Sequence, residues 1–374
     1  MKQTVDKLTI KGFKSIKQIE NFELKNLNVL LGGNGAGKSN FIDFFRLLRS
    51  MMELSLPGLQ NTNLQSFIKD GGGIHDFLFN GPKVTKEIEC KVFFGEIGYQ
   101  FKLSPTADEK VLIYDEKSYN KSVNKSWKYI GGGYDVSKLL ADKDDKTVNS
   151  PEKYDGFIYE SIQSCHIYHF NDSSKNAAMR HFEVIEDNDY LRFDAANIAP
   201  FLLSIREKSI ESYTDIIETI RLVIPFFHDF ILKESKNEKV RLNWKQKGSD
   251  YPMRPHLLSD GSMRFICLAS ALLQPDPPST IIIDEPELGM HPYAIEILAE
   301  LIEAASHKSQ VIISTQSSNL VDYFEPENII VAFRNDGSSM FSRLNTTELL
   351  HWMDEYTLGD LWRKNIISGV PVHE

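Results

Sequence analysis

The octapeptide GGNGAGKS at residues 32–39 combines the residue types that bind phosphate groups. It fits the pattern G-x-x-x-x-G-K-[ST] in full. Glycines let backbone N–H groups turn inward around phosphate oxygens, and the N-terminus of a following helix adds partial positive charge. Lys38 is expected to reach the outer phosphates of a nucleotide, and the Ser39 hydroxyl to bind Mg²⁺. The residues predicted to bind the nucleotide are Gly32, Asn34, Gly35, Gly37, Lys38, Ser39 and Asn40.

A second group of chemically capable residues lies in TIIIDEPE at residues 280–287. Apolar, mostly β-branched residues lead to Asp284, which is therefore expected at the carboxyl end of a buried strand, where α/β sheets bind ligands. Asp284 would hold Mg²⁺ through water, and Glu285 would act as general base on an attacking water. The alternative, an exposed acidic turn after a strand, is disfavoured by the glycine loop upstream.

The elements that must position these residues can be read from the hydrophobic pattern. Residues 7–16 and 21–31 are rich in β-formers and predict strands, and residues 41–52 have apolar side chains at helical spacing. The glycine loop therefore lies between a strand and a helix. The last third alternates strands and helices, which favours a parallel sheet covered on both faces. Its predicted elements are a helix at 262–273, strands at 280–285, 310–315 and 328–333, a helix at 293–306, and a helical tail.

The middle of the chain is less regular. Residues 67–104 predict antiparallel strands after a DGGG turn, and residues 105–160 are polar and turn-rich, which suggests surface excursions or a poorly ordered insertion. Its acidic run DKDDK at 142–146 is interpreted as a solvated loop. Residues 197–224 return to helical periodicity, and two short strands are expected within residues 228–246.

Composition narrows the class of protein. The chain has 374 residues, a formal net charge of −10 and ordinary proportions of hydrophobic (41%) and charged (25%) residues, so a generally basic, nucleic-acid-coating surface is disfavoured. The first fifty residues are an exception, because basic residues outnumber acidic ones there. Three widely separated cysteines predict buried thiols rather than a disulfide or zinc framework. No segment has the length of a membrane helix or the pattern of a signal peptide, so a cytoplasmic protein without membrane contact is expected.

Three further segments complete a family resemblance. LLSDGSMRF (257–265), IIIDEPELGMHP (281–292) and STQSSNLVDYF (314–324) are similar, in order, to the signature loop, the Walker B strand with its D-loop, and the switch segment of ATP-binding-cassette ATPases of the SMC/RecF/OLD-like branch. The segment around the glycine loop resembles the N-terminal lobe of that branch. The resemblance implies an α/β P-loop ATPase head with a mixed central sheet, an antiparallel β subdomain and a helical lobe. It implies one head over 1–374, with an N-terminal lobe at 1–104, an insertion and helical region at 105–255 and a C-terminal lobe at 256–374.

In this superfamily the signature loop completes the ATP site of a second subunit. By this resemblance Ser259, Asp260 and Gly261 are predicted to cap the γ-phosphate bound by another copy, so that two ATP molecules lie between two heads. The backbone N–H groups near the N-terminus of the following helix are physically suited to this role. A symmetric homodimer, or a higher homo-oligomer, is therefore expected. Ser259 could equally be the N-cap of that helix, and the two roles are compatible.

The sequence departs from the family pattern at the switch. Many cassette ATPases carry a histidine where STQSS places Gln316, which is assigned a catalytic role here. Glutamine can hydrogen-bond a phosphate or a water but cannot usefully accept a proton, so slow hydrolysis is expected unless the change has no kinetic consequence. The glutamine of the Q-loop is not placed, with Gln65 and Gln163 as candidates. FKS at 13–15 resembles the segment near the adenine.

Other features define what the chain is expected to lack. No sustained heptads are present, so the long coiled coil of SMC proteins is not predicted. The carboxylate set of an OLD-like nuclease is not found, and EDND at 186–189 is interpreted as a polar loop. HIYHF at 166–170 is better explained by strand alternation than by metal ligation. LGDLWRKN at 358–365, with an exposed-looking Trp362, suggests either a partner-docking helix or packing within the head.

The expected activity is ATP binding and slow, Mg²⁺-dependent hydrolysis, coupled to dimerisation. Because no effector domain is recognised, the resemblance suggests a switch that regulates a separate effector protein, such as a nuclease, in bacterial anti-phage defence. The alternatives are a RecF-like factor that binds duplex DNA, for which salt-dependent DNA binding would be the discriminating observation, and a nucleotide-dependent scaffold with negligible turnover.

Overall fold

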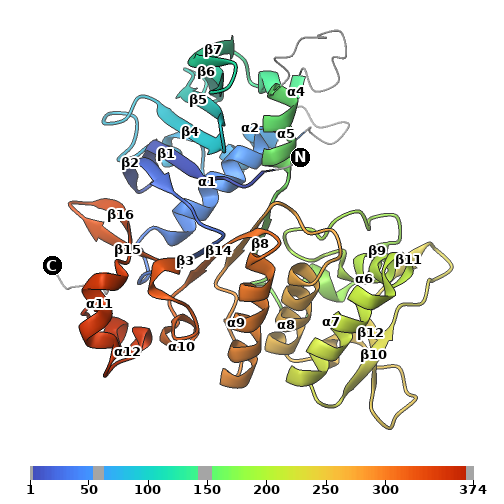
Figure 1. Ribbon diagram of the computed structural model, residues 1–374. Coiled ribbons are helices and arrows are strands. Elements are labelled where there is room, and N and C mark those ends of the chain that lie inside the picture. The colour runs from blue at the N-terminus through green and yellow to red at the C-terminus, as the bar shows by residue number, and fades with distance from the viewer. Residues whose placement is uncertain (1–2, 54–62, 142–153, 368–374) are drawn as a thin grey trace. The chain divides into compact units, whose positions relative to one another are not determined.

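The computed structural model describes residues 3–53, 63–141 and 154–367 (Figure 1). Two compact units are present. The first unit consists of residues 1–166, 330–344 and 365–374, and the second of residues 167–329 and 345–364. Each unit therefore contains a piece of chain from the C-terminal part of the sequence. The acidic run at 142–146 lies outside the described residues.

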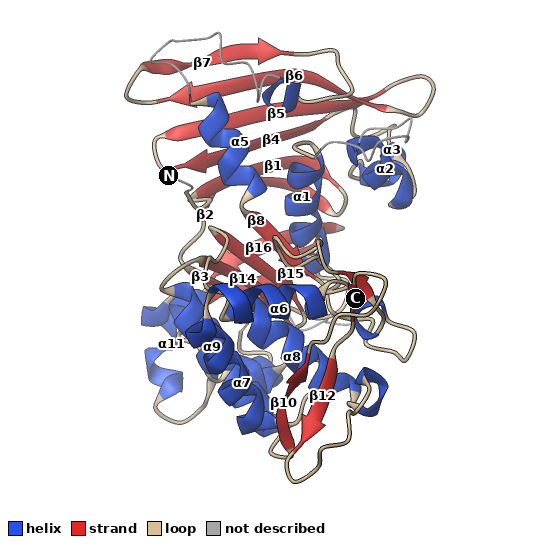
Figure 2. Ribbon diagram, turned by 90° about the vertical axis from the view of Figure 1, so that its right-hand side faces the viewer, coloured by secondary structure: helices blue, strands red, loops and turns tan. Residues whose placement is uncertain are grey.

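The largest element of the first unit is an antiparallel sheet with the strand order β2-β1-β4-β5-β6-β7 (Figure 2). Its strands are β1 (Lys7–Phe13), β2 (Ile16–Glu23), β4 (Ile88–Phe94), β5 (Ile97–Pro105), β6 (Val111–Asn120) and β7 (Asn124–Gly131). Alternate residues of β4 are buried, as expected for a sheet with one covered face. Figure 2 shows helix α5 (Asp155–Gln163) lying across the sheet.

The sequence predicted this region only in part. Strands β4 and β5 are confirmed, but residues 63–77 form α2 (Asn63–Asp70) and α3 (Ile74–Phe77) rather than strands. The expectation of a polar excursion after residue 105 is wrong for β6 and β7, which extend the sheet. The buried positions of β6 include the polar residues Glu116 and Ser118, and this hides the strand pattern. The short helix α4 (Lys138–Ala141) precedes the segment outside the description.

The phosphate-loop candidate also lies in the first unit. Strand β3 (Leu27–Leu31) is entirely buried and helix α1 (Lys38–Ser50) follows the loop, so the predicted strand–loop–helix order is confirmed. The predicted strand at 21–31 is in fact the end of β2, a turn, and β3. Beside β3 lies β15 (Ile329–Asn335), which pairs with β16 (Ser338–Arg343) as an antiparallel hairpin. Strand β16 was not predicted.

The second unit is built on two parallel strands and the helices that pack beside them. β13 (Thr280–Asp284) and β14 (Gln310–Thr315) pair in register and are buried along their whole length. Helices α8 (Asp260–Leu272) and α9 (Pro292–Ser306) pack on each other, and α7 (Ile210–Val223) packs on both. The predicted strands and helices of this region are confirmed, except that α8 begins two residues earlier than expected. The longest described helix is α9, with 15 residues, so the described residues form no long coiled coil.

The rest of the second unit surrounds this core. Strand β8 (Cys165–Tyr168) lies where the chain passes from the first unit to the second. The expected helical region at 197–224 is two helices, α6 (Ile198–Lys208) and α7, and the two expected strands are present as β10 and β12. The small strands are β9 (Glu183–Val184), β10 (Phe227–Ile231), β11 (Lys239–Val240) and β12 (Asn243–Gln246).

The C-terminal segment of the second unit forms short helices. They are α10 (Ser318–Val321), α11 (Thr346–Met353) and α12 (Leu358–Arg363). The expectation that Trp362 is exposed is wrong, since its side chain is buried where α12 packs against α10. All three cysteines are buried free thiols, as predicted. Among the helices of the described chain, none has the length and apolar character needed to cross a membrane.

Candidate functional site

The phosphate loop connects β3 to α1 within the first unit. Gly35 and Gly37 have φ values of 77° and 105°, in the left-handed region that favours glycine. A Cβ atom at Gly37 would lie 2.1 Å from the Ser339 hydroxyl oxygen, and one at Gly32 would lie 2.5 Å from the Ala332 carbonyl oxygen. Gly32 and Gly37, the two glycines that the phosphate-loop pattern specifies, are therefore also required by these close contacts.

The polar side chains of the loop are placed as a phosphate cradle requires. The Lys38 side chain is buried and its Nζ donates to the carbonyl oxygens of Gly32 (2.7 Å) and Gly33 (3.2 Å), so it folds back over the loop. Ser39 is exposed at the first turn of α1, where backbone N–H groups have no intrahelical acceptor. Asn34 and Gly35 are exposed at the tip of the loop. The loop therefore presents an exposed hydroxyl and an exposed tip, while the Lys38 ammonium group is held by carbonyl oxygens of the same loop.

A serine of the FKS segment, which the sequence associated only with the adenine, supports this loop. The Asn40 amide donates to the Ser15 hydroxyl oxygen (2.6 Å), which is 2.7 Å from the Ser339 hydroxyl beside Gly37. Ser15 belongs to the FKS segment, and the preceding Lys14 forms an ion pair with Asp43 of α1 (2.6 Å). The segment predicted to lie near the adenine thus contacts the phosphate-loop helix. Its contact with adenine stays a prediction.

The two candidates for the Q-loop glutamine are both engaged elsewhere in the first unit. The Gln65 amide donates to the Val111 carbonyl (2.6 Å) and accepts from the Val111 N–H (3.2 Å), which ties α2 to β6. The Gln163 amide donates to the Met52 carbonyl. Neither contact points to a ligand site.

In the second unit, Asp284 is fixed at the carboxyl end of β13. Its side chain is 8% exposed and accepts a hydrogen bond from the Ser314 hydroxyl of the neighbouring strand. His169 approaches from the segment after β8, with its Nδ1 atom 3.6 Å from the second carboxylate oxygen of Asp284. HIYHF is largely strand, as predicted, but nothing in the sequence indicated that its second histidine would lie beside Asp284. The signal for Ser314 was available, since it is the first residue of the switch segment and lies near the end of a predicted strand.

The structure brings Glu285 and Gln316 together. The Gln316 amide donates to a Glu285 carboxylate oxygen at 3.2 Å, and both side chains are reached by solvent. Glu285 has φ of 46°, an uncommon conformation for a residue with a side chain, and its N–H donates to the Ser314 carbonyl (3.0 Å). Parallel strands end at the same edge of a sheet, and β13 and β14 therefore present these two residues side by side.

A further acid, Glu287, lies close behind this pair. Its side chain is 7% exposed and accepts a hydrogen bond from the Thr315 hydroxyl (2.5 Å). Burial raises the pKa of the Glu287 carboxyl, and the nearby Glu285 charge raises it further. Sequence analysis did not assign Glu287 a role. Its place after a proline in the turn gave no indication of burial.

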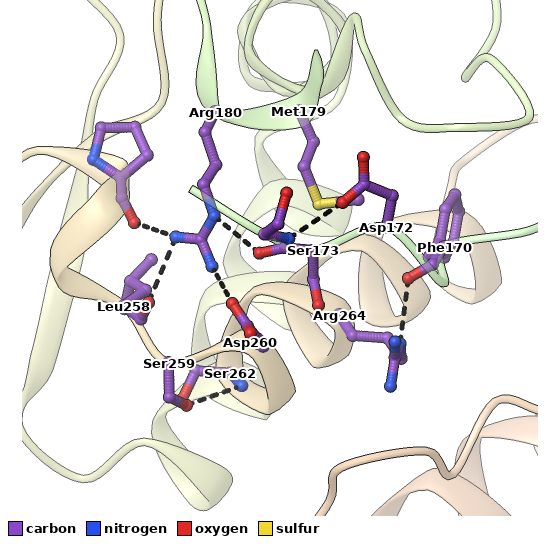
Figure 3. Close-up of polar contacts among 12 residues, drawn as sticks. Phe170, Asp172, Ser173, Met179, Arg180, Leu258, Ser259, Asp260, Ser262 and Arg264 are labelled. Carbon is purple, nitrogen blue, oxygen red and sulfur yellow. Dashed lines mark hydrogen bonds and ion pairs between the residues drawn. The ribbon is translucent and has the colours of Figure 1, made fainter. Parts of the chain in front are cut away.

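The signature residues form the first turn of α8 (Figure 3). The Ser259 hydroxyl accepts from the Ser262 N–H (3.1 Å), so the N-cap interpretation is confirmed, while its role toward a second copy stays a prediction. Because α8 begins at Asp260, the N–H groups of Asp260 and Gly261 lie in the first turn. A Cβ atom at Gly261 would lie 2.2 Å from the Gly289 carbonyl oxygen, so the signature turn packs directly on the D-loop.

Two buried arginines hold this region, and sequence reasoning missed both. Arg264 donates to the carbonyl oxygens of Phe170 (3.0 Å), Asn171 (3.1 Å) and Leu288, and so links α8 to the D-loop and to the segment after His169. Arg180 lies behind the signature loop and contacts Asp260 at 2.9 Å (Figure 3). An isolated arginine in NAAMRHF carries no local signal of such a long-range role.

The remaining polar clusters are structural. Asp187 of EDND pairs with Arg192 (2.8 Å) and lies near Asn197, as a loop would. Among the described residues, no group of three or more His, Cys, Asp or Glu side chains is placed to hold a metal ion.

Comparison with known proteins agrees with this arrangement. The model of the family described as "AAA domain, putative AbiEii toxin, Type IV TA system" matches residues 27–322. No curated protein matches the sequence significantly.

Solved SMC heads share the fold. The chain is similar to an SMC head bound to the C-winged helix domain of ScpA, with a TM-score of 0.56 and 18% identity over 93% of this chain and 99% of that one. It is also similar to the SMC head with an extended coiled coil, bound to the C-terminal domain of ScpA, from Pyrococcus furiosus, with a TM-score of 0.53 and 15% identity over 94% and 98%. At these identities the likeness shows the fold, that of an SMC head. Since the family model covers most of the chain, the protein belongs to this AAA-domain family of P-loop ATPases.

Proposed function

We propose that the protein binds ATP through the phosphate loop and hydrolyses it with Glu285 as general base. The observation that carries this proposal is the contact between the Gln316 amide and the Glu285 carboxylate, 3.2 Å apart at the carboxyl ends of two paired parallel strands. The carboxylate is reached by solvent, and the amide orients it. A water held by this pair would lose its proton to Glu285 as it attacks the terminal phosphate.

The residues also suit Mg²⁺, which prefers hard oxygen ligands and keeps several of its own waters. Ser39 offers an exposed hydroxyl, and Asp284 offers a carboxylate fixed by Ser314. When bound, the ion would neutralise charge on the phosphates. Lys38 would leave the carbonyl oxygens of Gly32 and Gly33, because those oxygens repel the anion that the ammonium group binds.

Gln316 supports slow turnover. Its amide can hold the carboxylate and a water, but it cannot take up the proton that a histidine at this position could accept. The hydrolysis step then depends on Glu285 alone for proton transfer.

The test is the turnover of Glu285→Gln. General-base catalysis contributes about 10²- to 10⁴-fold, so we expect a loss of kcat in that range while ATP binding persists. The isosteric amide keeps an oxygen that Gln316 can contact, which limits structural damage. Glu300→Gln removes a similar charge from an exposed position on α9 and should leave kcat within about twofold. Turnover by Glu285→Gln equal to that of the parent would reject the proposed base.

We further propose that ATP drives association of two copies and that the ATP-bound dimer regulates a separate effector protein in anti-phage defence. The support is the signature turn, an N-capped helix start at which Ser259 and Asp260 are exposed. SMC heads have been solved bound to domains of ScpA, a precedent for a partner protein on this fold.

The RecF-like alternative receives less support. Three of the basic residues in the N-terminal segment form ion pairs with carboxylates of the first unit, Lys7 with Glu23, Lys11 with Glu20 and Lys14 with Asp43. Paired lysines contribute little net positive potential toward a phosphate backbone.

A further inference from the structure

The signature turn contains a charge of the wrong sign for its proposed role. Asp260 occupies the first turn of α8 beside Ser259 and Gly261, and its side chain is 66% exposed. A carboxylate there suits the helix dipole, but it repels the triphosphate that the turn is proposed to cap. This inference rests on the proposed ATP-dependent association, which needs an explanation of how an anion approaches Asp260.

Arg180 is placed to supply that explanation. Its side chain is 3% exposed, and its guanidinium contacts Asp260 Oδ1 through Nη2 at 2.9 Å (Figure 3). Because the arginine is buried and the aspartate faces solvent, the positive charge lies behind the turn and leaves its outer surface open.

The other donors of Arg180 fix the backbone of the same loop. Nη1 donates to the carbonyl oxygens of Pro255 and of Leu258 (3.1 Å), which precede Ser259, and Nε donates to the Ser173 carbonyl (3.0 Å). Carbonyl oxygens turned inward toward a guanidinium are turned away from an incoming anion. One side chain therefore sets both the direction of the loop's dipoles and the charge balance of the turn.

We propose that Arg180 is a positioning residue of the signature turn, which neutralises Asp260 and turns the loop carbonyls inward so that the turn can accept an anionic phosphate carried by a second copy. Arg180 does not touch the phosphate itself. It acts through Asp260 and through the backbone of residues 255–258.

The experiment measures ATP-dependent dimerisation in the Glu285→Gln parent, by light scattering over a range of protein concentrations. Arg180→Met should raise the midpoint concentration at least about tenfold. Adding Asp260→Asn to Arg180→Met should recover a large part of that loss, because the uncompensated carboxylate is then gone. A buried arginine with only a structural role predicts no recovery. Absence of recovery, or an unchanged midpoint in Arg180→Met, overturns the inference.

Asp260→Asn alone tests the same point if Arg180→Met fails to fold. With Arg180 intact, this change makes the turn more positive, so the midpoint should stay equal or fall and should become more sensitive to added NaCl. A higher midpoint would overturn the inference.

The control pair is Arg192→Met with Asp187→Asn, another arginine–aspartate pair of the second unit at 2.8 Å, which should not shift the midpoint. If the Glu285→Gln parent does not associate with ATP at all, the proposed dimerisation fails instead.

Discussion

The three acids at the end of β13 and in the turn that follows it differ in their access to water, and the proposed roles follow this difference. Asp284 is buried and fixed by a hydroxyl, Glu285 is reached by solvent, and Glu287 is buried against Thr315. A ligand for a hydrated metal ion needs a fixed carboxylate, whereas a general base needs one that water can reach. The buried third acid is expected to influence stability rather than catalysis directly.

Glu287 predicts a pH-dependent stability. Its folded-state pKa is raised by burial, so the folded protein favours the protonated carboxyl. Its stabilising contribution is therefore present below the ordinary carboxyl pKa of 4.5 and is lost as pH rises through the raised value. Relative to the parent, Glu287→Gln should gain stability as the pH increases from about 4.5 to 8. Urea unfolding at several pH values measures this. A difference that stays constant, or shrinks with rising pH, contradicts it.

Gln316 predicts a kinetic effect. Loss of one hydrogen bond to a charged group costs about 1.5 kcal/mol, or roughly tenfold in rate, so Gln316→Ala should lower kcat by about that factor with little change in KM. Gln246→Ala in β12 is a matched control outside the site and should not alter kcat. Gln316→His should increase turnover if glutamine is the cause of slow hydrolysis. An unchanged rate in Gln316→His would count against that explanation.

Residues that belong to local motifs could be predicted from the sequence, whereas residues that act through long-range contacts could not. The phosphate loop and the contact between Glu285 and Gln316 follow from patterns within a few residues and from strand order. Arg180 and Arg264 donate to backbone carbonyls that are far away in the sequence. His169 likewise contacts the carboxylate of Asp284, which is distant in the sequence. Neither periodicity nor spacing in the sequence predicts such contacts. A buried arginine can donate hydrogen bonds to any carbonyl oxygens that the tertiary structure brings near it.

At the scale of elements, α8 packs closely on the D-loop at Gly261. Gly261 has no room for a Cβ atom, because the Gly289 carbonyl oxygen would lie 2.2 Å away. Gly261→Ala must therefore separate the helix from the loop, and overpacking of this kind costs about 1–3 kcal/mol. We expect a lower free energy of unfolding and weaker ATP-dependent association.

Gly156→Ala is the control for this prediction. A Cβ atom at Gly156 in α5 would meet nothing within 4 Å, and alanine is the better helix former by about 1 kcal/mol. Its effect on stability should be neutral or favourable. Equal unfolding free energies for Gly261→Ala and the parent, measured in urea, would show that the packing can relax.

Elements were predictable where burial made the pattern strong. The parallel strands β13 and β14 are buried along their length around runs of isoleucine and valine, and their bounds follow almost residue by residue from the sequence. Strands β6 and β7 lie toward one edge of the sheet, and β6 buries the polar residues Glu116 and Ser118, so the apolar alternation typical of a strand is interrupted. Helices α2 and α3 were missed because three consecutive glycines at 71–73 suggested a hairpin, whereas the turn joins two short helices.

At the scale of the whole molecule, the chain carries one phosphate loop and one signature turn, in different units. An exposed helix start whose carboxylate is paired with a buried arginine is suited to an anion that reaches it. If a second copy supplies that anion, the phosphate loop of each chain faces the signature turn of the other. Such a reciprocal arrangement is expected for a closed two-fold dimer. The proposed function therefore depends on association as much as on the hydrolytic residues.

This dependence gives the last prediction. In Glu285→Gln, ATP with Mg²⁺ should double the mass measured by light scattering, because hydrolysis no longer releases the dimer. Ser259→Arg in that background should abolish the doubling, since a bulky side chain would occupy the turn. Loss of the N-cap alone costs about 1 kcal/mol. Ser209→Arg, at the N-cap of α7, removes an equivalent cap and should leave the doubling intact. A mass already doubled without nucleotide would place ATP inside a standing oligomer. A persistent monomer would mean that the signature turn serves no second copy of this chain.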